Sequence, residues 1–446
     1  MSNRTSYLLA VLLLLLTTFL RLWQITTLPI GFSNPELHQI DLMQDRTLQG
    51  EIRVFYETQD GGQEGLYQML LALTGVAFGT GTMGLRLLSV FASLLTVALM
   101  YSLGVRLFGR WAGVAAAAFL SANLLASLLA RVVLVQSLLP LLFTAVLLSL
   151  ARAFPVYQRL RAETSNTIDF AALGTLLGIG LYLHPMGILL VLVAMLFIVH
   201  ILSYRARISL RRISYIGFSL LMLIIISMPY LISSARLPEL AAGQRILGDY
   251  QGLLTATWRS LGGIFLVGDH SVLLNVSQRP LIDLVSGFLL LIGLALCIRY
   301  WRHARYALPL LAGLLLFPAV VLAGDAPNFT SMSMLLPVLA LYFGLGFSVL
   351  LRAIPQRGRW LGVLGALGLL VFNVGWVGQD LFVTWPEQDG VYEAYNGRVG
   401  QIAHRIDTTA DDIPTVLCYP NWNMPHMPGQ QRTAVDRILL HMNRNT

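Results

Sequence analysis

Three carboxylates that could do chemistry lie between the first two strongly apolar segments of the sequence. They are Glu36, Asp41 and Glu64, and the stretch that carries them spans about 28–85. A carboxylate held near a reacting hydroxyl group can remove its proton as a general base. Glu36 or Asp41 is therefore our candidate for a catalytic base.

Glu36 also has a structural interpretation. The run Ser33-Asn-Pro-Glu36 has the form of a helix capping box with proline in the first turn. A glutamate at this position accepts hydrogen bonds from the free amides at the start of the helix. The two roles can coexist, and the sequence leaves both open.

Several residues of this stretch have side chains that suit a divalent metal. His38, Asp41 and Asp45 are spaced i, i+3 and i+7, which places them on one face of the helix predicted to follow Ser33. A metal could be held there, although a solvated polar face is the more ordinary interpretation. Glu64 and His184 are our other candidate ligands for a metal or a phosphate, with a helix-capping carboxylate and a hydrogen-bonded interfacial histidine as the alternatives.

Two arginines, Arg86 and Arg131, stand at the ends of apolar segments. The guanidinium fork matches the geometry of phosphate oxygens, so both are candidates for binding a lipid phosphate. The alternative is that their side chains extend to the lipid headgroups.

The composition decides what kind of scaffold must position these residues. The 446 residues are 56% hydrophobic and 12% charged, and their mean hydropathy is +0.70. Soluble domains average about 25% charged residues, so the chain is predicted to be an all-α polytopic membrane protein. At about 20 apolar residues per span, we predict eleven spans: 7–27, 86–107, 111–130, 133–153, 169–184, 186–203, 213–233, 281–300, 306–324, 330–351 and 360–381.

The basic residues predict the orientation. All 30 are arginine, and 16 of them lie in the loops on one side of the predicted membrane, where the only acidic residues are Glu163 and Asp169. Positive loops stay in the cytoplasm, so the amino terminus is predicted inside and the carboxyl terminus outside. The net charge of +8 is explained in this way and gives no reason to expect a nucleic-acid partner.

The predicted organisation is a membrane domain over 1–381 and a small outer segment over 382–446. The outer side has two long loops, about 28–85 and 234–280, and the short apolar stretch 66–78 is predicted to lie in the interface. The final segment is predicted to be a small α/β unit, with a helix near 395–406, a strand at 413–419 and a helix at 434–442.

The titratable residues within the predicted spans argue against an ion-coupled transporter. Only His184 and His200 are titratable well inside the spans, whereas ion-coupled transporters place acidic or histidine relays near the midplane. No glycine-rich nucleotide loop is present either. We therefore expect any reaction at the outer surface, without a soluble nucleotide-linked substrate.

Four stretches of the first half resemble the GT-C membrane glycosyltransferases, in particular the branch of the protein O-mannosyltransferases and the lipid A aminoarabinose transferase. They are Arg21-Leu-Trp with Leu28-Pro29, then Pro35-Glu36, then Gly62-Gln-Glu64-Gly-Leu-Tyr, and then Leu85-Arg86-Leu-Leu-Ser89 with Leu107-Phe-Gly-Arg110. Pro35 stands where the family usually has an aspartate. Glu36 matches the second family carboxylate, and Asp41 is the nearby substitute for the first.

The resemblance implies a GT-C fold and transfer of a sugar from a polyprenyl-phosphate donor to an acceptor at the outer face. It implies a carboxylate base in the first loop, and arginines or a divalent metal that balance the departing lipid phosphate. We expect a chain in the cytoplasmic membrane of a bacterium, with membrane lipids and the lipid donor as its partners. Because family side chains are missing, the alternative is a catalytically silent subunit of a membrane complex.

Overall fold

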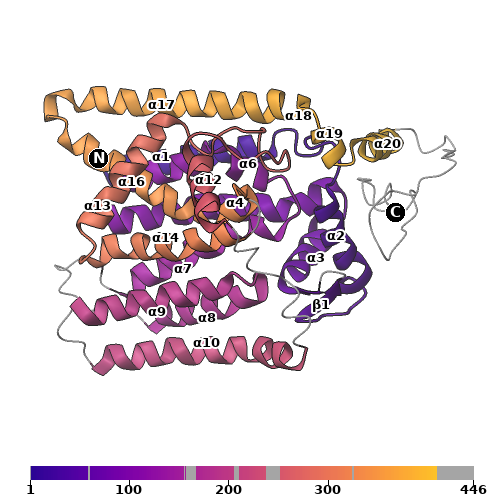
Figure 1. The fold of residues 1–446 in the computed structure, drawn as a ribbon, viewed down its shortest axis with the longest axis horizontal. Helices are drawn as coiled ribbons and strands as arrows, with labels where there is room; N and C mark the ends of the chain where they lie inside the picture. The colour runs from indigo at the N-terminus through magenta and orange to yellow at the C-terminus, as the bar shows by residue number, and fades with distance from the viewer. Residues whose placement is uncertain are drawn as a thin grey trace.

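Long helices that lie side by side form most of the molecule (Figure 1). The computed structural model describes residues 2–58, 61–154, 156, 167–204, 210–237, 252–323 and 326–408. The helices and strands of this part are α1 (Asn3–Leu22), α2 (Asn34–Leu42), β1 (Phe55–Thr58), β2 (Gly61–Glu64), α3 (Leu66–Phe78), α4 (Thr82–Phe108), α5 (Arg110–Ser121), α6 (Leu124–Leu129), α7 (Leu139–Ala153), α8 (Thr167–Leu183), α9 (Gly187–Tyr204), α10 (Leu210–Arg236), α12 (Leu253–Phe265), α13 (Leu284–Arg299), α14 (Ala304–Leu322), α15 (Phe329–Met332), α16 (Leu336–Ala353), α17 (Arg359–Gln379), α18 (Trp385–Glu387), α19 (Val391–Ala394) and α20 (Gly397–Thr408).

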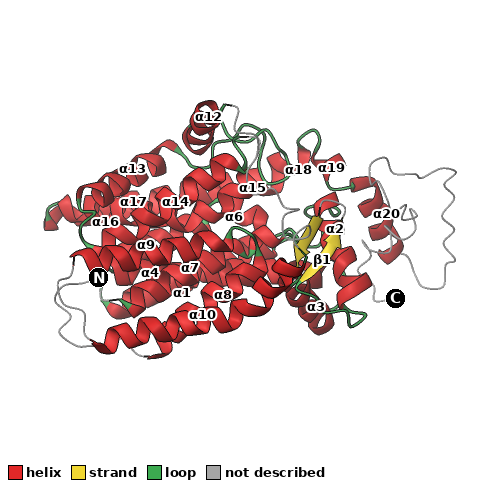
Figure 2. Ribbon diagram, turned by 60° about the horizontal axis from the view of Figure 1, so that its bottom comes forward, coloured by secondary structure: helices red, strands yellow, loops and turns green. Residues whose placement is uncertain are grey.

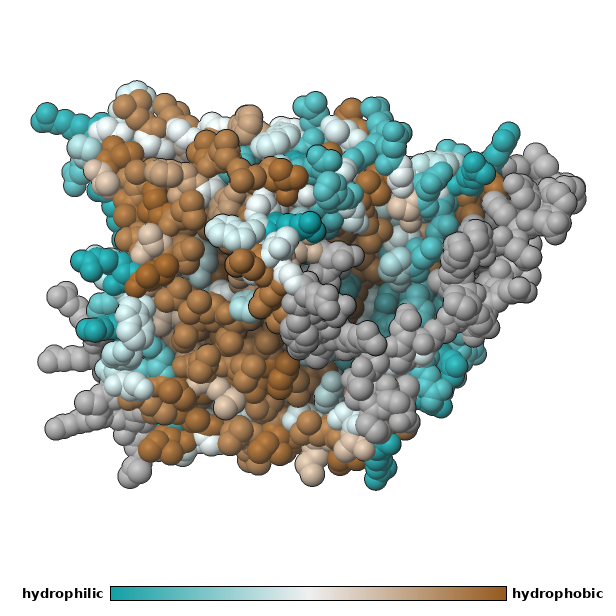
Figure 3. Space-filling view, viewed as in Figure 1, coloured by the Kyte–Doolittle hydropathy of each residue, from teal (hydrophilic) through white to brown (hydrophobic). Residues whose placement is uncertain are grey.

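The prediction of an all-α polytopic membrane protein is confirmed. Among the described residues, eight helices are long and apolar enough to cross a membrane, and α3, α8 and α13 are shorter apolar helices. Figure 3 shows an apolar surface over the middle of the helices, with hydrophilic residues gathered at both ends. Every predicted span overlaps at least one helix, but the count of eleven crossings stays a prediction.

One predicted span is broken in two. The segment predicted at 111–130 is divided into α5 and α6, because the chain leaves the helix at Ala122 and starts again after Asn123. The Asn123 side chain accepts a hydrogen bond from the backbone N–H of Ala126 at 3.1 Å and so caps α6. An asparagine inside an apolar run is the sequence signal for this break.

The centre of the bundle is α16, which packs against α5 and α13. In the apolar window of the helix at Phe329–Ala353, 83% of the residues are buried, against 11% for Arg211–Arg236 and 6% for Gln356–Glu387. The helices α10 and α17 therefore form opposite edges of the bundle, as Figure 1 shows.

Glycines allow α13 and α16 to approach closely. A Cβ atom on Gly293 would lie 1.9 Å from the carbonyl oxygen of Tyr342, and one on Gly346 would lie 1.9 Å from that of Leu289. Small residues of this kind bring membrane helices into backbone contact, where dispersion forces act over the whole helix face.

The short elements of the first loop gather at one end of the bundle, which we call the loop end (Figure 1). It contains α2, the antiparallel hairpin β1–β2 and α3. The hairpin is the sheet visible in Figure 2, and its register pairs Phe55 with Glu64.

The beginning of the last segment is bound to the second long loop. Trp385 donates from Nε1 to the carbonyl oxygen of Val272 at 2.7 Å, and the Tyr395 hydroxyl donates to that of Leu273 at 2.6 Å. The predicted helix near 395–406 is found as α20. The strand predicted at 413–419 and the helix predicted at 434–442 lie outside the described residues.

The orientation of the bundle can be tested with introduced cysteines. In a Cys418→Ser background, we expect a membrane-impermeant maleimide to label Ser271→Cys in intact cells, and Gln356→Cys only after lysis. The reason is that Gln356 lies among Arg352, Arg357 and Arg359, which the positive-inside rule places in the cytoplasm.

Cys297 is buried and should stay unlabelled in both variants. Labelling of Gln356→Cys in intact cells would reverse the predicted orientation.

Candidate active site

Glu36 is fully buried at the start of α2 and has hydrogen bonds to both carboxylate oxygens. Its Oε2 atom accepts from the backbone N–H of Ser33 at 2.8 Å and from the Ser33 hydroxyl at 2.7 Å. Its Oε1 atom accepts from the N–H of Val133 at 2.9 Å, so Glu36 joins α2 to the segment after α6. Burial raises the pKa of Glu36, while the charge of Arg86 and the hydrogen bonds oppose the increase. The capping role expected from the sequence is therefore present.

Arg86 is equally buried and binds backbone carbonyls. Its Nη1 atom donates to the oxygens of Ile25 and Pro29 at 2.6 and 3.1 Å, and its Nη2 atom donates to that of Gly31 at 2.7 Å. The guanidinium carbon lies 5.0 Å from the centre of the Phe32 ring. Within the described part of the chain, Nε has no hydrogen-bond partner.

Arg131 also binds backbone carbonyl groups at the end of α1 and after it. Its Nη2 atom donates to the oxygens of Leu20 and Trp23 at 2.8 and 2.6 Å, and its Nη1 atom donates to that of Leu28 at 3.3 Å. Its Nε atom also lacks a partner among the described residues. Together Arg86 and Arg131 bind six carbonyl groups between residues 20 and 31.

A third buried arginine, Arg21, joins α1 to the break between α5 and α6. Its guanidinium donates to the carbonyl oxygens of Leu120 and Ser121 at 3.0 and 3.2 Å and to the Ser127 hydroxyl at 2.8 Å. We call Arg21, Arg86 and Arg131 the arginine cluster. Because the cluster uses its Nη donors on protein oxygens, a phosphate would meet its positive potential rather than a free guanidinium fork.

The structure does not assemble the metal site that the spacing of His38, Asp41 and Asp45 suggested. In the described ranges, no three His, Cys, Asp or Glu side chains are grouped closely enough to hold a metal ion. His38 and Asp41 are half-buried, whereas Asp45 is exposed. Glu64 and His184 belong to no such group among the described residues either, so their role as metal ligands stays a prediction.

Glu64 has a different environment from Glu36. It ends strand β2 and is 5% exposed, and burial raises its pKa to about 7. A carboxyl group with this pKa exchanges protons readily near neutral pH, which is the property that a general acid or base needs.

A network of amide side chains joins the elements that carry the two glutamates. The Gln39 side-chain oxygen accepts from Nε2 of Gln63 at 2.6 Å and from Nε2 of Gln68 at 2.7 Å. Neighbouring residues of a strand point to opposite faces, so Gln63 faces this network while Glu64 faces away from it. The network fixes the hairpin against α2 and α3.

Aromatic side chains lie on the face of the hairpin that carries Glu64. Phe55, its partner in the hairpin register, packs on Tyr230 with 5.1 Å between the ring centres, and Tyr230 packs on Tyr182 at 5.5 Å. Tyr230 is also within electrostatic reach of the Glu64 carboxylate.

A break in the hydrogen bonds of α10 positions these tyrosines. Pro229 lies inside that helix, where proline disturbs the helical hydrogen bonds. The Tyr182 hydroxyl accepts from the N–H of Tyr230 at 3.0 Å and donates to the carbonyl oxygen of Ile226 at 2.8 Å. The hydroxyl group thus replaces a missing helical hydrogen bond.

His184 follows Tyr182 by two residues, in the turn between α8 and α9. Its Nδ1 atom accepts a hydrogen bond from the backbone N–H of Met186 at 3.1 Å. A neutral imidazole that accepts at Nδ1 carries its proton on Nε2. His184 therefore presents a donor, which suits a phosphate or hydroxyl oxygen better than a metal ion.

Sequence reasoning missed three parts of this site. It did not find the amide network, the aromatic wall beside Glu64, or the use of Tyr182 to close the gap in α10. Pro229 within a predicted span was the available signal for the last of these.

The arrangement is that of a polytopic membrane protein with a fold of GT-C type, and comparisons with known proteins confirm the predicted resemblance to the GT-C membrane glycosyltransferases. Residues 66–232 match the family described as dolichyl-phosphate-mannose-protein mannosyltransferase. No curated protein matches the chain in sequence.

Solved structures share the fold over nearly the whole chain. ArnT from Cupriavidus metallidurans bound to undecaprenyl phosphate is 14% identical, with a TM-score of 0.59 over 93% of this chain and 82% of that protein. The oligosaccharyltransferase AglB from Archaeoglobus fulgidus, in complex with an inhibitory peptide and a dolichol-phosphate, is 13% identical, with a TM-score of 0.54 over 98% of this chain and 64% of AglB. A further structure of the Archaeoglobus fulgidus oligosaccharyltransferase, with Zn and sulfate, has a TM-score of 0.52 at 13% identity, over 97% of this chain and 61% of that protein.

The importance of the arginine cluster can be tested by removing one member. Arg86→Leu leaves three carbonyl oxygens without a donor and leaves Glu36 without its nearby positive charge. Breaking a buried charge interaction of this kind costs about 3–5 kcal/mol, so the variant should unfold at a clearly lower midpoint in SDS titrations of the micelle-solubilised protein. Arg152→Leu removes an exposed arginine from α7 and should change the midpoint little. Equal midpoints for the two variants would contradict the anchoring role of Arg86.

Proposed function

We propose that the chain transfers a sugar from a polyprenyl-phosphate donor to an acceptor at the outer face of the membrane. The fold shared with ArnT and AglB supports this proposal, because their structures contain undecaprenyl phosphate and dolichol-phosphate respectively. The observation that carries it is the carboxyl group of Glu64, which is shielded from water and has a pKa of about 7.

In the proposed reaction, an acceptor hydroxyl attacks the anomeric carbon of the donor sugar. The new bond forms between the acceptor oxygen and this carbon, while the bond from the carbon to the phosphate oxygen breaks. The carboxylate of Glu64 takes the acceptor proton, and the polyprenyl phosphate leaves with the bonding electrons.

The assignment of the base to Glu64 rests on the contrast with Glu36. Within the described ranges, the hydrogen bonds of Glu36 go to Ser33 and Val133, and the residue is 0% exposed, which supports a positioning role. Asp41 remains the second candidate for the base, since it is half-buried on the same helix.

The arginine cluster contributes charge to the proposed reaction. It contains three positive charges, and Glu36 is the carboxylate that interacts with Arg86. Positive potential at a site of low dielectric favours the anionic phosphate as it departs. His184 could add a direct hydrogen bond from Nε2, and we assign no step to a metal.

The proposed reaction requires that the loop end lies outside the cytoplasm of a bacterial cell. A donor bound in the outer leaflet would then present its sugar to Glu64. The same placement puts the arginine-rich loops inside, in agreement with the positive-inside rule.

The alternative is a catalytically silent subunit of a membrane complex. The full structural use of the Glu36 carboxylate favours it, because a family carboxylate would then be retained for folding alone. The two functions differ in whether the purified chain turns over a lipid-linked sugar.

Removing the base should remove turnover. We expect Glu64→Gln to lower the release of radiolabelled sugar from polyprenyl-phosphate donors by about 10²–10⁴-fold, the usual contribution of a general base. Glu57→Gln changes an exposed glutamate of the same hairpin and should leave the rate unaltered. Asp41→Asn, measured in parallel, tests the second candidate.

No turnover of any donor by the wild-type chain, combined with stable co-purification of partner proteins, would replace the enzyme with the silent subunit. Full activity of Glu64→Gln would remove Glu64 from the mechanism while keeping the transferase.

The dependence of the wild-type rate on pH should report Glu64. A base works only when deprotonated, so kcat/KM should rise about tenfold per pH unit below pH 7 and level off above it. A profile whose lower limb is centred near pH 4.5 would point to an unperturbed carboxylate instead.

A further inference from the structure

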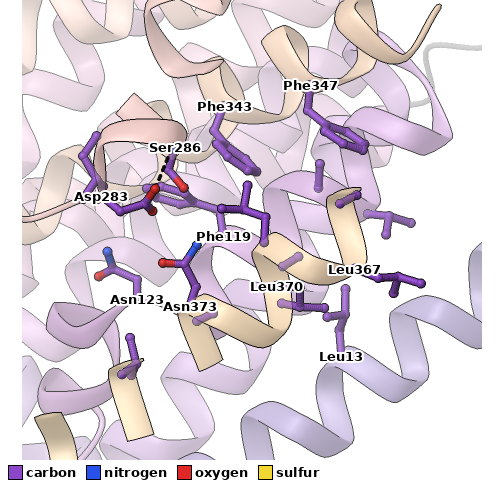
Figure 4. Close-up of a pocket in the computed structure, with 18 of the residues that line it drawn as sticks. Leu13, Phe119, Asn123, Asp283, Ser286, Phe343, Phe347, Leu367, Leu370 and Asn373 are labelled. Carbon is purple, nitrogen blue, oxygen red and sulfur yellow. Dashed lines mark hydrogen bonds between the residues drawn. The ribbon is translucent and has the colours of Figure 1, made fainter. Parts of the chain in front are cut away.

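A cavity of about 350 Å³ lies between α17 and the rest of the bundle. Its walls come from α1, α5, α13, α16 and α17, and most of its lining is apolar (Figure 4). The volume lies within the range of about 300–1,000 Å³ that is typical of ligand sites.

One face of α17 forms the outer wall of this cavity. Its residues Val363, Ala366, Leu370, Asn373 and Val377 recur at helical spacing, and all of them line the cavity. They cover about 21 Å of helix at 1.5 Å per residue, which exceeds the hydrocarbon depth of one leaflet, about 15 Å. An extended lipid chain therefore fits along the helix.

Polar side chains gather at the end of the cavity near the loop end. Asn123, Asp283, Ser286 and Asn373 lie there, whereas Phe347, Leu367 and Leu13 line the remainder (Figure 4). Asn373 makes no hydrogen bond to any described residue, although an amide group within a membrane helix ordinarily finds a partner. The backbone N–H of Ser286 occupies one oxygen of Asp283, at 2.9 Å.

The charge at this end indicates which headgroup fits. The only cation that lines the cavity within the described chain is Arg279. Its Nε atom lies 2.7 Å from Oδ2 of Asp380. Its guanidinium carbon lies 4.5 Å from the ring centre of Trp376. Since Asp380 neutralises Arg279, the carboxylate of Asp283 would repel a phosphate. Both ends of the Asn123 amide are already bonded, to Ala126 and Leu281. The Asn373 amide, the Ser286 hydroxyl and the second carboxylate oxygen of Asp283, beside the indole ring of Trp376, instead match the hydroxyl groups and the apolar face of a sugar.

We propose that this cavity binds a neutral glycosyl lipid, with one chain along α17 and the sugar hydroxyls at Asn373 and Asp283. Its polar end includes Asn123, which lies in the break between α5 and α6 where Arg21 binds. The part of the cavity along α17 is distinct from the Glu64 site, because α17 and α10, which carries Tyr230 beside Glu64, form opposite edges of the bundle (Figure 1). The proposal goes beyond sugar transfer and does not depend on it, since binding can be measured without turnover.

Native mass spectrometry of the full chain, released from phosphatidylglycerol nanodiscs that contain monoglucosyl diacylglycerol, tests the proposal. We expect one retained glycolipid per chain. Ala366→Trp fills the cavity and should abolish retention, whereas the matched control Leu364→Trp changes a residue that is 53% exposed on another face of α17 and should not. Asn373→Leu keeps the apolar wall and should weaken retention about threefold to tenfold, the effect of one lost hydrogen bond.

Each other outcome overturns the assignment. Equal retention of phosphatidylglycerol would show nonselective lipid contact. Preferential retention of an added polyprenyl phosphate, blocked by Ala366→Trp, would make the cavity a donor site. Unchanged retention in Ala366→Trp would place the glycolipid elsewhere, and no retained lipid in the wild type would leave the cavity without this ligand.

Discussion

The structure depends on how the irregular backbone after α1 is satisfied at the membrane boundary. Away from water, a backbone carbonyl without a partner is costly, so non-helical chain near the membrane needs donors from the protein itself. Arg86 and Arg131 supply them to six carbonyls between residues 20 and 31. A lysine ammonium has three donors on one nitrogen atom, whereas a guanidinium spreads five donors over a fixed plane and can bind carbonyl oxygens that lie farther apart. The positions of α2, the hairpin and α3 all follow from this connection.

The two glutamates of the first loop show how different surroundings give the same carboxyl group different properties. Glu36 is surrounded by donors and a nearby arginine, so its charge stabilises the start of α2 and the segment at Val133. Glu64 lies beside aromatic rings, where little compensates for the loss of water. This difference is the reason that we propose Glu64, and not Glu36, as the base.

Local sequence patterns predicted the helices and the Glu36 cap, because apolar length and the Ser33-Asn-Pro-Glu36 run act over a few residues. They did not predict what the arginines bind, since the carbonyl groups that Arg131 holds are more than 100 positions away in the chain. Tyr182 in the gap of α10 and the cavity beneath α17 depend on packing between distant helices in the same way. The spacing of His38, Asp41 and Asp45 was misleading, because a shared helix face does not supply ligands from a second element.

The segment after α17 binds both long loops and so couples their positions. Tyr395 is bonded to Leu273 in the second loop, and its neighbour Asn396 donates to the carbonyl oxygen of Phe32 in the first, at 2.9 Å. Adjacent residues of one short chain therefore hold both loops, so neither can separate from the bundle without straining the attachment of the other. Displacement of either loop should accordingly be cooperative, with both loops and residues 385–396 moving as one unit.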